Sequence, residues 1–285
     1  MKFELYFEPA SVAECCALLK EYGKDAKLLA GGTDLVPRMR SGVLAPKAVI
    51  ALYNIPGLAE IKEVEDGIIL GSCYPMRKLS KSAELAKWPA LQAAAGHVSS
   101  MQVRNVATIG GNACNASPSA DGVEGLMIYN AEVIIASESG ERKVAIADFF
   151  KGPGKTVLED GELVTGFYLK NPAAKSGAYY HKFAIRGDTD IAIVGAGANL
   201  TLDAEGKVCE ATISMASVAP TPLRAKAAEE YLIGKCVTEE TAAAAAELAA
   251  EAATPITDAR ATAEYRKEMV KVWVRHAILD AAKAI

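Results

Sequence analysis

Apolar residues near the N-terminus recur first at helical and then at extended spacing. Residues 11–14 (SVAE) have the form of a capping box and open a helical stretch that Gly23 ends. Residues 26–30 (AKLLA) have the composition of a short strand, which runs into a turn at 31–34 (GGTD). Helical character follows over 35–40. The pattern therefore predicts a strand, a glycine turn and a helix in immediate succession.

The middle of the chain combines turn residues with short apolar runs. Glu65-Asp66-Gly67 is a good turn sequence, and the apolar residues on either side predict a β-hairpin over 58–72. An alanine-rich stretch over 82–96 is helical in character, apart from Pro89. Further short strands are predicted at 48–52, 132–136 and 163–169.

The pattern changes close to residue 172. Residues 171–177 (NPAAKSG) are the best candidate for a linker. Two long strands joined by a tight turn are predicted beyond it, and helices follow them. Because strands and helices do not alternate regularly, the order favours an α+β fold over a doubly wound parallel sheet. The two strands are 191–202 and 208–218, and the helices are 224–234, 239–253 and a last one from about 261.

Charge and composition exclude several classes of function. Thirty-one Lys and Arg residues against 35 Asp and Glu residues give a formal net charge of −4. Without a basic excess or a basic stripe, a nucleic-acid binder is not expected. No apolar run approaches the length of a membrane-spanning helix. The first residues carry acids and lack the apolar region of a signal peptide, so we expect a cytoplasmic chain.

The cysteines are scattered and form no CxxC pair. Structural zinc and iron–sulfur sites draw on closely spaced thiolates, so no metal site is expected in this chain. A disulfide framework is a poor interpretation for a chain without a secretory signal. Buried or half-buried free thiols are the favoured interpretation. The six residues are Cys15, Cys16, Cys73, Cys114, Cys209 and Cys236.

Two glycine-rich turns are the strongest functional signal. They lie at 28–35 (LLAGGTDL) and 107–118 (ATIGGNACNASP). Glycine pairs let backbone N–H groups point into one concavity without a β-carbon in the way, and such nests bind phosphate oxygens. Neither turn has the GxGxxG form after a strand, and no P-loop motif occurs. Either these are two ordinary glycine turns, or together they clasp the two phosphates of a dinucleotide from opposite sides.

The remaining candidate residues form no catalytic motif. Asp121 either accepts from a ribose hydroxyl or base amine, or caps the helix that follows it, and Asp34 has the same capping alternative. The three histidines are too scattered for a metal site or a triad, and no GxSxG or HExxH motif occurs. No catalytic side chain is assigned. The sequence instead suggests a site for a dinucleotide whose own ring performs the chemistry.

Four sequence blocks resemble the FAD-binding subunit of the molybdenum hydroxylases, the family of xanthine dehydrogenase, aerobic carbon monoxide dehydrogenase and nicotinate dehydrogenase. The first two blocks are 29–35 (LAGGTDL) and 107–121 (ATIGGNACNASPSAD). The other two are 181–192 (HKFAIRGDTDIA) and 258–266 (DARATAEYR). The blocks come in the family's order, and the length suits its free-standing medium subunit. The resemblance covers essentially the whole chain.

The resemblance implies an α+β fold in two domains. An FAD-binding domain of the vanillyl-alcohol-oxidase type would occupy 1–172, as two α+β subdomains at about 1–55 and 56–172. An extended FAD would lie between these subdomains. A C-terminal domain over 173–285 would pack a small antiparallel sheet of three or four strands on helices and cover the flavin ring.

The resemblance also implies which residues hold FAD. The first turn would wrap the pyrophosphate and the second would complete the clasp, while Ser117 and Asp121 would reach the pyrophosphate–ribose or adenine end. Residues 186–190 would form a mobile loop at the open face of the isoalloxazine, near Lys182. The backbone at Leu163 and Val164 would meet the adenine or flavin edge. The expected FAD-binding residues are Lys27, Leu28, Leu29, Ala30, Gly31, Gly32, Thr33, Asp34, Leu35, Ala107, Thr108, Gly110, Gly111, Asn112, Ser117, Asp121, Leu163, Val164 and Lys182.

The activity implied is electron transfer within a heterotrimer, or a dimer of it. Electrons would pass from a molybdopterin-binding large subunit through [2Fe–2S] clusters on a small subunit to FAD, and then to NAD or another acceptor. The chain has no four-cysteine insertion, which argues against the subgroup that acts on aromatic acyl-CoA thioesters. The ASPSAD form of the second turn is more similar to the purine and xanthine branch, so the expected donor is xanthine or another purine or N-heterocycle. Two alternatives stay open: a stand-alone FAD-dependent oxidase or dehydrogenase of the same fold, and a non-catalytic scaffold that has lost the flavin.

Overall fold

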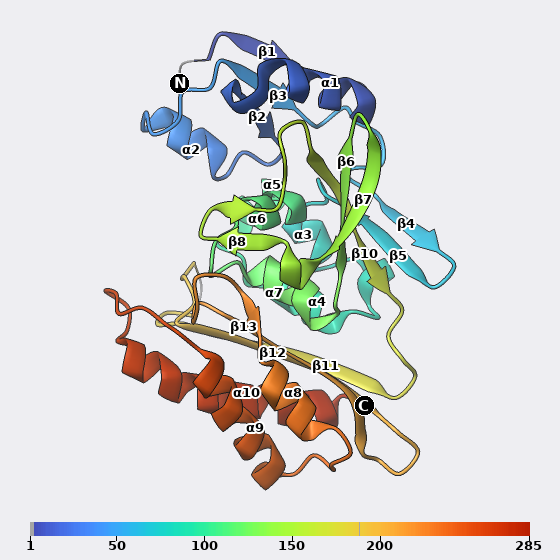
Figure 1. Ribbon diagram of the computed structural model, residues 1–285, viewed down its shortest axis with the longest axis vertical. Coiled ribbons are helices and arrows are strands. Elements are labelled where there is room, and N and C mark those ends of the chain that lie inside the picture. Colours follow the sequence, from blue (N-terminus) through green and yellow to red (C-terminus); the bar gives the residue numbers. More distant parts are fainter. Residues whose placement is uncertain (1–2, 188) are drawn as a thin grey trace.

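Three main sheets follow one another along the longest axis of the molecule, in the order of the chain (Figure 1). The structure is a computed structural model that describes residues 3–187 and 189–285. Sheets and helices are combined without regular alternation, which confirms the predicted α+β class.

The first sheet is small and parallel. Its elements are β1 (Leu5–Phe7), α1 (Val12–Tyr22), the 3-10 helix η1 (Gly23–Asp25), β2 (Ala26–Leu29), α2 (Leu35–Arg40) and β3 (Ala48–Ala51). The strand order is β1-β3-β2, and every residue of the central strand β3 is buried. Helix α1 begins where the Ser11 hydroxyl accepts the Glu14 N–H, and it ends at Gly23, whose φ of 49° favours glycine. The predicted strand, glycine turn and helix are therefore confirmed.

The second sheet is antiparallel and carries a group of short helices. Its elements are β4 (Ile61–Val64), β5 (Gly67–Gly71), α3 (Met76–Leu79), the 3-10 helix η2 (Ala83–Leu85), α4 (Pro89–Gly96), α5 (Met101–Val106), α6 (Ile109–Cys114), α7 (Asp121–Ile128), β6 (Glu132–Ser137), β7 (Gly140–Ala145), the 3-10 helix η3 (Ile146–Asp148), β8 (Phe150–Gly152), β9 (Lys155–Thr156) and β10 (Leu163–Lys170). The strand order is β4-β5-β10-β6-β7, and β4 and β5 form the predicted hairpin. The sequence did not predict β7, because none of its residues is buried and half of them are charged. Only its pairing with β6 makes it a strand.

The third sheet is antiparallel and is covered on both faces. Its elements are β11 (Ser176–Phe183), β12 (Val194–Leu202), β13 (Val208–Ala216), β14 (Leu223–Arg224), α8 (Lys226–Leu232), α9 (Glu239–Ala252) and α10 (Ala263–Lys283). The strand order is β11-β12-β13-β14, so the expected small sheet packed on helices is confirmed. Helices α8 and α10 pack on one side of it, while α4 and α7 contact it from the other (Figure 1). The sequence missed β11, which begins inside the predicted linker and pairs along its whole length with β12.

Each main sheet has its own hydrophobic cluster. The first contains the buried thiols of Cys15 and Cys16, and the second is built around Trp88, Phe149 and Phe167. The third cluster is rich in alanine. Because the alanine side chains on one face of α9 are small, this helix can approach α10 closely. These alanines are Ala242, Ala245, Ala246, Ala249 and Ala250.

Helix α10 is the longest helix, with 21 residues, and it is amphipathic. Val270, Val274 and Ile278 are buried on the side that contacts β11 and β12. Their spacing of four residues is that of one helix face, and the last helix predicted from about residue 261 is confirmed. In the part of the chain that the structure describes, neither this helix nor any other is long and apolar enough to cross a membrane.

We predict that Gly71→Ala strongly destabilises the fold. A β-carbon at this position lies 2.4 Å from the carbonyl oxygen of Leu58 and 2.6 Å from that of Gly57, and backbone atoms cannot move aside cheaply. The free energy of unfolding should fall by about 2 kcal/mol or more in urea denaturation followed by circular dichroism. The control is Gly96→Ala, where the nearest atom lies at 3.8 Å and the change should stay within about 0.5 kcal/mol. Equal effects of the two substitutions contradict the packing argument.

Candidate functional site

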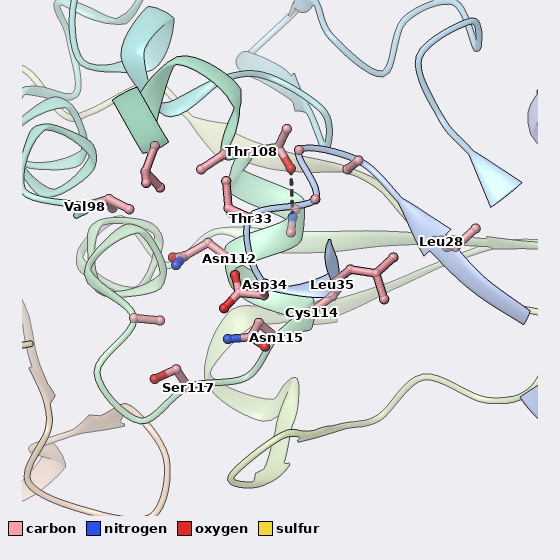
Figure 2. A pocket seen from close by; sticks show the side chains of 18 of the residues that line it. Leu28, Thr33, Asp34, Leu35, Val98, Thr108, Asn112, Cys114, Asn115 and Ser117 are labelled. Carbon is pink, nitrogen blue, oxygen red and sulfur yellow. Dashed lines mark hydrogen bonds between the residues drawn. The ribbon is translucent and has the colours of Figure 1, made fainter. Parts of the chain in front are cut away.

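A pocket of about 860 Å³ opens where the first glycine turn meets helices α5 and α6. Residues 189–191, which connect β11 to β12, contribute to its lining from the C-terminal part of the chain. Figure 2 shows Thr33, Asp34 and Asn112 grouped around the same space, with Ser117 farther along it. The pocket is therefore assembled from segments that are far apart in the sequence.

Most of the residues that the sequence assigned to FAD line this pocket. They are Lys27, Leu28, Ala30, Gly31, Gly32, Thr33, Asp34, Leu35, Ala107, Thr108, Gly110, Gly111, Asn112, Ser117, Asp121 and Val164. Three others lie behind the lining. Leu29 packs toward Gly32, Leu163 is fully buried in the cluster of the first sheet, and Lys182 binds the carboxylate of Asp121. The structure thus brings the two predicted turns to one cavity.

The first glycine turn has the backbone geometry of a nest, with N–H groups that no acceptor among the described residues takes up. Within the described chain, the backbone N–H groups of 31–34 donate to no protein acceptor, although helix α2 begins immediately after them. Gly32 has a φ of +69°, which turns successive N–H groups toward one side. The Val36 N–H donates to the Gly32 carbonyl at 2.9 Å and closes the turn. These unpaired donors line a pocket, where an anion can satisfy them.

Gly31 allows the two turns to meet. A β-carbon on Gly31 would lie 2.0 Å from the carbonyl oxygen of Val106, the last residue of α5. Residues 107 and 108 follow directly and lead into α6, where the second glycine pair lies. Glycine is required here because backbone, rather than a flexible side chain, occupies the space.

The second glycine turn differs from the first, because its N–H groups are used within the protein. The Gly110 N–H donates to the Ser72 carbonyl at 2.7 Å, and the Gly111 N–H donates to the Thr108 hydroxyl at 3.1 Å (Figure 2). What this turn offers to the pocket is the side chain of Asn112, whose buried Oδ1 has no hydrogen-bond partner among the described residues. The two turns are therefore not equivalent: one presents backbone donors and the other a side-chain amide.

The capping alternatives for the two aspartates are wrong. Asp34 stands at the N-cap position of α2, but its side chain accepts no hydrogen bond from that helix and faces the pocket. Burial raises the pKa of Asp34, and the charge of Arg38 partly opposes that rise. Asp121 is the first residue of α7, and the N-cap is Ala120.

Asp121 joins the pocket wall to the third sheet. Its carboxylate accepts from the Tyr180 hydroxyl at 2.6 Å and from the Lys182 ammonium at 2.8 Å, both on β11. The side chains of Lys182 and Asp121 are 4% and 9% exposed. The Lys182 ammonium also donates to the His97 carbonyl at 3.0 Å. Burial raises the pKa of Asp121, while Lys182 and Tyr180 oppose the rise by stabilising the carboxylate.

A second acid, Glu124, lies behind Asp121 on α7. Its side chain is fully buried, and neither carboxyl oxygen has a hydrogen-bond partner among the described residues. A β-carbon on Gly195 of β12 would lie 2.0 Å from Glu124 Oε2, so the strand leaves room for this acid. Burial, with the neighbouring Asp121 charge, raises the pKa of Glu124 well above its usual range, and Lys182 opposes the rise.

Sequence reasoning missed several lining residues that carry no local signal. Ser72, Val98 and Ser99 come from loops whose composition is ordinary, and tertiary contacts alone bring them to the pocket. The φ of +46° at Ser99 is a feature that a sequence does not reveal. The predicted mobile loop is 186–190, of which Asp188 lies outside the described residues. Asp190 of this loop accepts hydrogen bonds from the backbone N–H and the guanidinium of Arg186. The mobility of that loop stays a prediction.

The lining fits an adenine dinucleotide. The unpaired N–H groups of 31–34 suit phosphate oxygens. Val98 and Val103 supply apolar wall for a flat ring. A cavity of this size is large enough for a cofactor that is mostly enclosed.

Family models match both parts of the chain. Residues 1–172 match the FAD binding domain in molybdopterin dehydrogenase, and residues 178–281 match the CO dehydrogenase flavoprotein C-terminal domain. The chain belongs to the FAD-binding subunits of the molybdenum hydroxylase family. It is thus an FAD-dependent flavoprotein, as the resemblance in its sequence implied.

Curated relatives in this family match over almost their whole length. The xanthine dehydrogenase FAD-binding subunit of Escherichia coli O157:H7 is 33% identical, covering 99% of this chain and 97% of that protein. The carbon monoxide dehydrogenase medium chain of Afipia carboxidovorans is 34% identical, covering 98% of this chain and 96% of that protein. The relatives in this family are therefore named for different substrates, xanthine and carbon monoxide.

Solved structures of family members share the whole fold. Reconstituted CO dehydrogenase from Oligotropha carboxidovorans matches with a TM-score of 0.95 at 32% identity, covering 100% of this chain and 99% of that one. Quinoline 2-oxidoreductase from Pseudomonas putida 86 matches with a TM-score of 0.91 at 31% identity, covering 99% of both chains. This flavoprotein therefore has the three-sheet architecture of its family.

We predict that Gly32→Ala weakens FAD binding. A side chain at φ +69° is strained, and the new β-carbon lies 2.9 Å from the Leu29 side chain, so the nest should lose its shape. The dissociation constant of FAD should rise at least about tenfold in a flavin fluorescence titration. Gly57→Ala is the matched control, because Gly57 has a φ of +82° but has open space around its β-carbon position and does not line the pocket. Equal losses in both variants contradict the assignment of the nest.

We predict that Glu124→Gln removes a pH dependence of stability. The unfolded chain ionises this acid above about pH 4.5, whereas the folded chain retains the proton. The free energy of unfolding of the wild type therefore falls as the pH rises toward the folded-state pKa, by about 1.4 kcal/mol per pH unit from this group. The melting temperature of the variant should exceed that of the wild type by an amount that grows as the pH rises above about 5.

The control for this pH series is the exposed Glu63 of β4. Glu63→Gln should follow the wild type at every pH, because this side chain lies at the surface and stays in water when the chain folds. A constant difference between the Glu124→Gln variant and the wild type across the series contradicts the buried, protonated state of Glu124.

Proposed function

We propose that this flavoprotein is the electron-relaying subunit of a three-subunit hydroxylase or dehydrogenase that contains molybdopterin. Electrons reach its FAD from [2Fe–2S] clusters on a small partner subunit and leave for NAD or another acceptor. The proposed donor is xanthine or another purine or N-heterocycle, which is oxidised on the large subunit. The FAD supplies electron and hydride transfer when it is bound.

The observation that carries this proposal is the kind of groups that line the pocket. Its unpaired backbone donors at 31–34 suit an anion such as the pyrophosphate of a held cofactor. The acids at its wall are Asp34, Asp121 and Asp190, of which the last two are tied to Lys182 and Arg186. Such a lining binds and orients a cofactor. Relatives named as a medium chain or an FAD-binding subunit support the placement in a larger complex.

The proposed roles of the residues follow from their positions. The turn at 27–34 holds the pyrophosphate through backbone N–H groups, and residues 108–112 complete the clasp with the Asn112 amide. Ser117 and Asp121 lie on the path toward a ribose, and Leu163 and Val164 support the edge of the cofactor from β10. Lys182 acts from behind Asp121, as a positive charge near the end of the pocket that the third sheet covers.

The proposed domains are an FAD-binding domain over 1–172, with subdomains at about 1–55 and 56–172, and a C-terminal domain over 173–285. The three sheets and their separate hydrophobic clusters support this division. Contacts of α4 and α7 with the third sheet support the idea that the C-terminal domain closes one end of the pocket and excludes water there.

The test is the composition and the electron flow of the native assembly. A tagged chain isolated from its own cells should bring down two further polypeptides, and the complex should contain molybdenum, iron and FAD. Adding the donor should bleach the flavin in the complex and leave the flavin of the isolated FAD-loaded chain oxidised. Turnover of an organic donor by the isolated chain supports a stand-alone oxidase instead, and a chain that stays colourless with ample FAD supports a scaffold.

A further inference from the structure

Residues 97–99, between α4 and α5, form a strained turn in the wall of the pocket. Val98 and Ser99 both line the pocket. Ser99 has a φ of +46°, a left-handed conformation that residues other than glycine adopt only at a cost. Such a residue keeps its conformation only where its surroundings hold it in place. The groups that hold this turn therefore control the shape of the pocket wall.

The carbonyl groups of this turn accept hydrogen bonds from two cationic side chains. A single nitrogen of the Arg104 guanidinium, Nη1, donates to the Val98 carbonyl at 2.9 Å and to the Ser99 carbonyl at 2.6 Å. The Lys182 ammonium donates to the His97 carbonyl at 3.0 Å. Hydrogen bonds from charged donors are stronger than those between neutral groups. Three successive carbonyls are therefore tied to positive charges.

The two cations differ in what else they bind. Lys182 also pairs with the carboxylate of Asp121, so its charge is shared between the turn and an acid. Arg104 is half-buried and forms an ion pair with no carboxylate among the described residues. The donors that its guanidinium uses are directed at the backbone of the turn. Holding that backbone is therefore the role that the contacts of Arg104 indicate.

Helix α5 aims Arg104 back at the turn that precedes it. The helix begins at Ser100, whose hydroxyl accepts the Val103 N–H at 3.3 Å. Side chains in a helix point toward its N-terminus, so an arginine one turn inside α5 reaches the carbonyls of 98 and 99. Val103, next to Arg104 in the chain, lines the pocket as well. The strained turn and the first turn of α5 are thus fixed together.

A pocket wall that is held before the cofactor arrives favours binding. If the turn sampled other conformations, the apparent affinity for the cofactor would fall in proportion to the fraction of chains with the correct wall. Ordering the wall during binding would also take part of the binding free energy. The hydrogen bonds of Arg104 are internal to the chain, so they can order the wall in advance.

We propose that Arg104 is a positioning residue for FAD binding, which holds Val98 and Ser99 in the strained conformation before FAD enters. The inference rests on the proposed placement of FAD in this pocket. Arg104 acts through the two carbonyls and is absent from the residues that line the cavity.

The test is a flavin fluorescence titration of the full chain with Arg104→Met, which keeps an apolar side chain of similar length and lacks the donors. The dissociation constant of FAD should rise at least about tenfold, because two charge-assisted hydrogen bonds are lost. The control is Arg224→Met. Arg224 donates to Glu229 and Asn130 beside the third sheet and does not line the pocket. This variant should bind FAD as the wild type does, even where its folded state is less stable.

A second substitution separates positioning from a general loss of stability. Glycine adopts a φ of +46° without strain, so Ser99→Gly alone should change the FAD affinity little. Added to Arg104→Met, it should restore most of the lost affinity. Wild-type affinity in Arg104→Met overturns the proposal, and so does a double variant that binds FAD as weakly as Arg104→Met alone.

Hydrogen exchange tests the wild type directly. Peptides covering 97–103 should be protected in the FAD-free chain, and Arg104→Met should lose that protection. A wild-type turn that exchanges freely until FAD is added overturns the proposal, even if the variant fails to fold. Gly32→Ala in the same titrations tests the placement of FAD separately. If it weakens binding, a negative result for Arg104 leaves that placement standing, and if neither substitution changes FAD binding, both fail.

Discussion

The contact between Gly31 and the carbonyl oxygen of Val106 is the constraint on which the site depends. No β-carbon fits there, so the first turn can lie against the end of α5 only because the residue is glycine. The chain passes from that carbonyl directly into the second turn and α6. One backbone contact therefore places the turn at 31–34, which follows a strand of the first sheet, beside helix α6 and its residue Asn112. The remaining lining residues complete a pocket whose position this contact sets.

In the proposed function, the nest lets a nearly neutral protein hold an anionic cofactor. The donors at 31–34 are backbone N–H groups, which are fixed by the turn and lose no side-chain entropy on binding. A surplus of Lys and Arg is unnecessary, in keeping with the net charge of −4. In an FAD-dependent subunit the flavin ring supplies the reacting atoms, and the protein supplies orientation and electrostatics. The lining of this pocket has that character.

The contact between α7 and the third sheet carries buried charge. Asp121 and Lys182 form an ion pair whose side chains are almost fully enclosed, and Tyr180 donates to the same carboxylate. Such a pair adds little net stability, but breaking it leaves an uncompensated charge in the interior. It therefore specifies how the C-terminal sheet sits on the pocket wall. Glu124 adds a second, fully buried acid to this junction, and burial beside Asp121 raises its pKa well above its usual range.

Local chemistry determined much of the N-terminal part and the identity of the two turns. The Ser11 cap, the stop at Gly23 and the 65–67 hairpin turn are decided by neighbouring residues, and the structure has them as predicted. Strands β7 and β11 were missed because one has no buried face and the other begins in a linker-like sequence, so that pairing alone makes them strands. Of the two alternatives left open for Asp34 and Asp121, capping was wrong, because the Asp34 side chain faces the pocket and residues of β11 bind Asp121.

The sequence by itself thus determined the cap and the stop of the first helix, the glycine turns and, through its resemblance, the family and FAD, because these depend on residues that are adjacent along the chain. Only the tertiary structure decided that the N–H groups of the first turn have no acceptor among the described residues, whereas those of Gly110 and Gly111 in the second turn donate to protein oxygens. It also decided that Lys182 lies behind Asp121 and that the Glu124 carboxyl is buried without a hydrogen-bond partner among the described residues. The physical reason is that hydrogen-bond saturation and desolvation are set by neighbours that folding brings together.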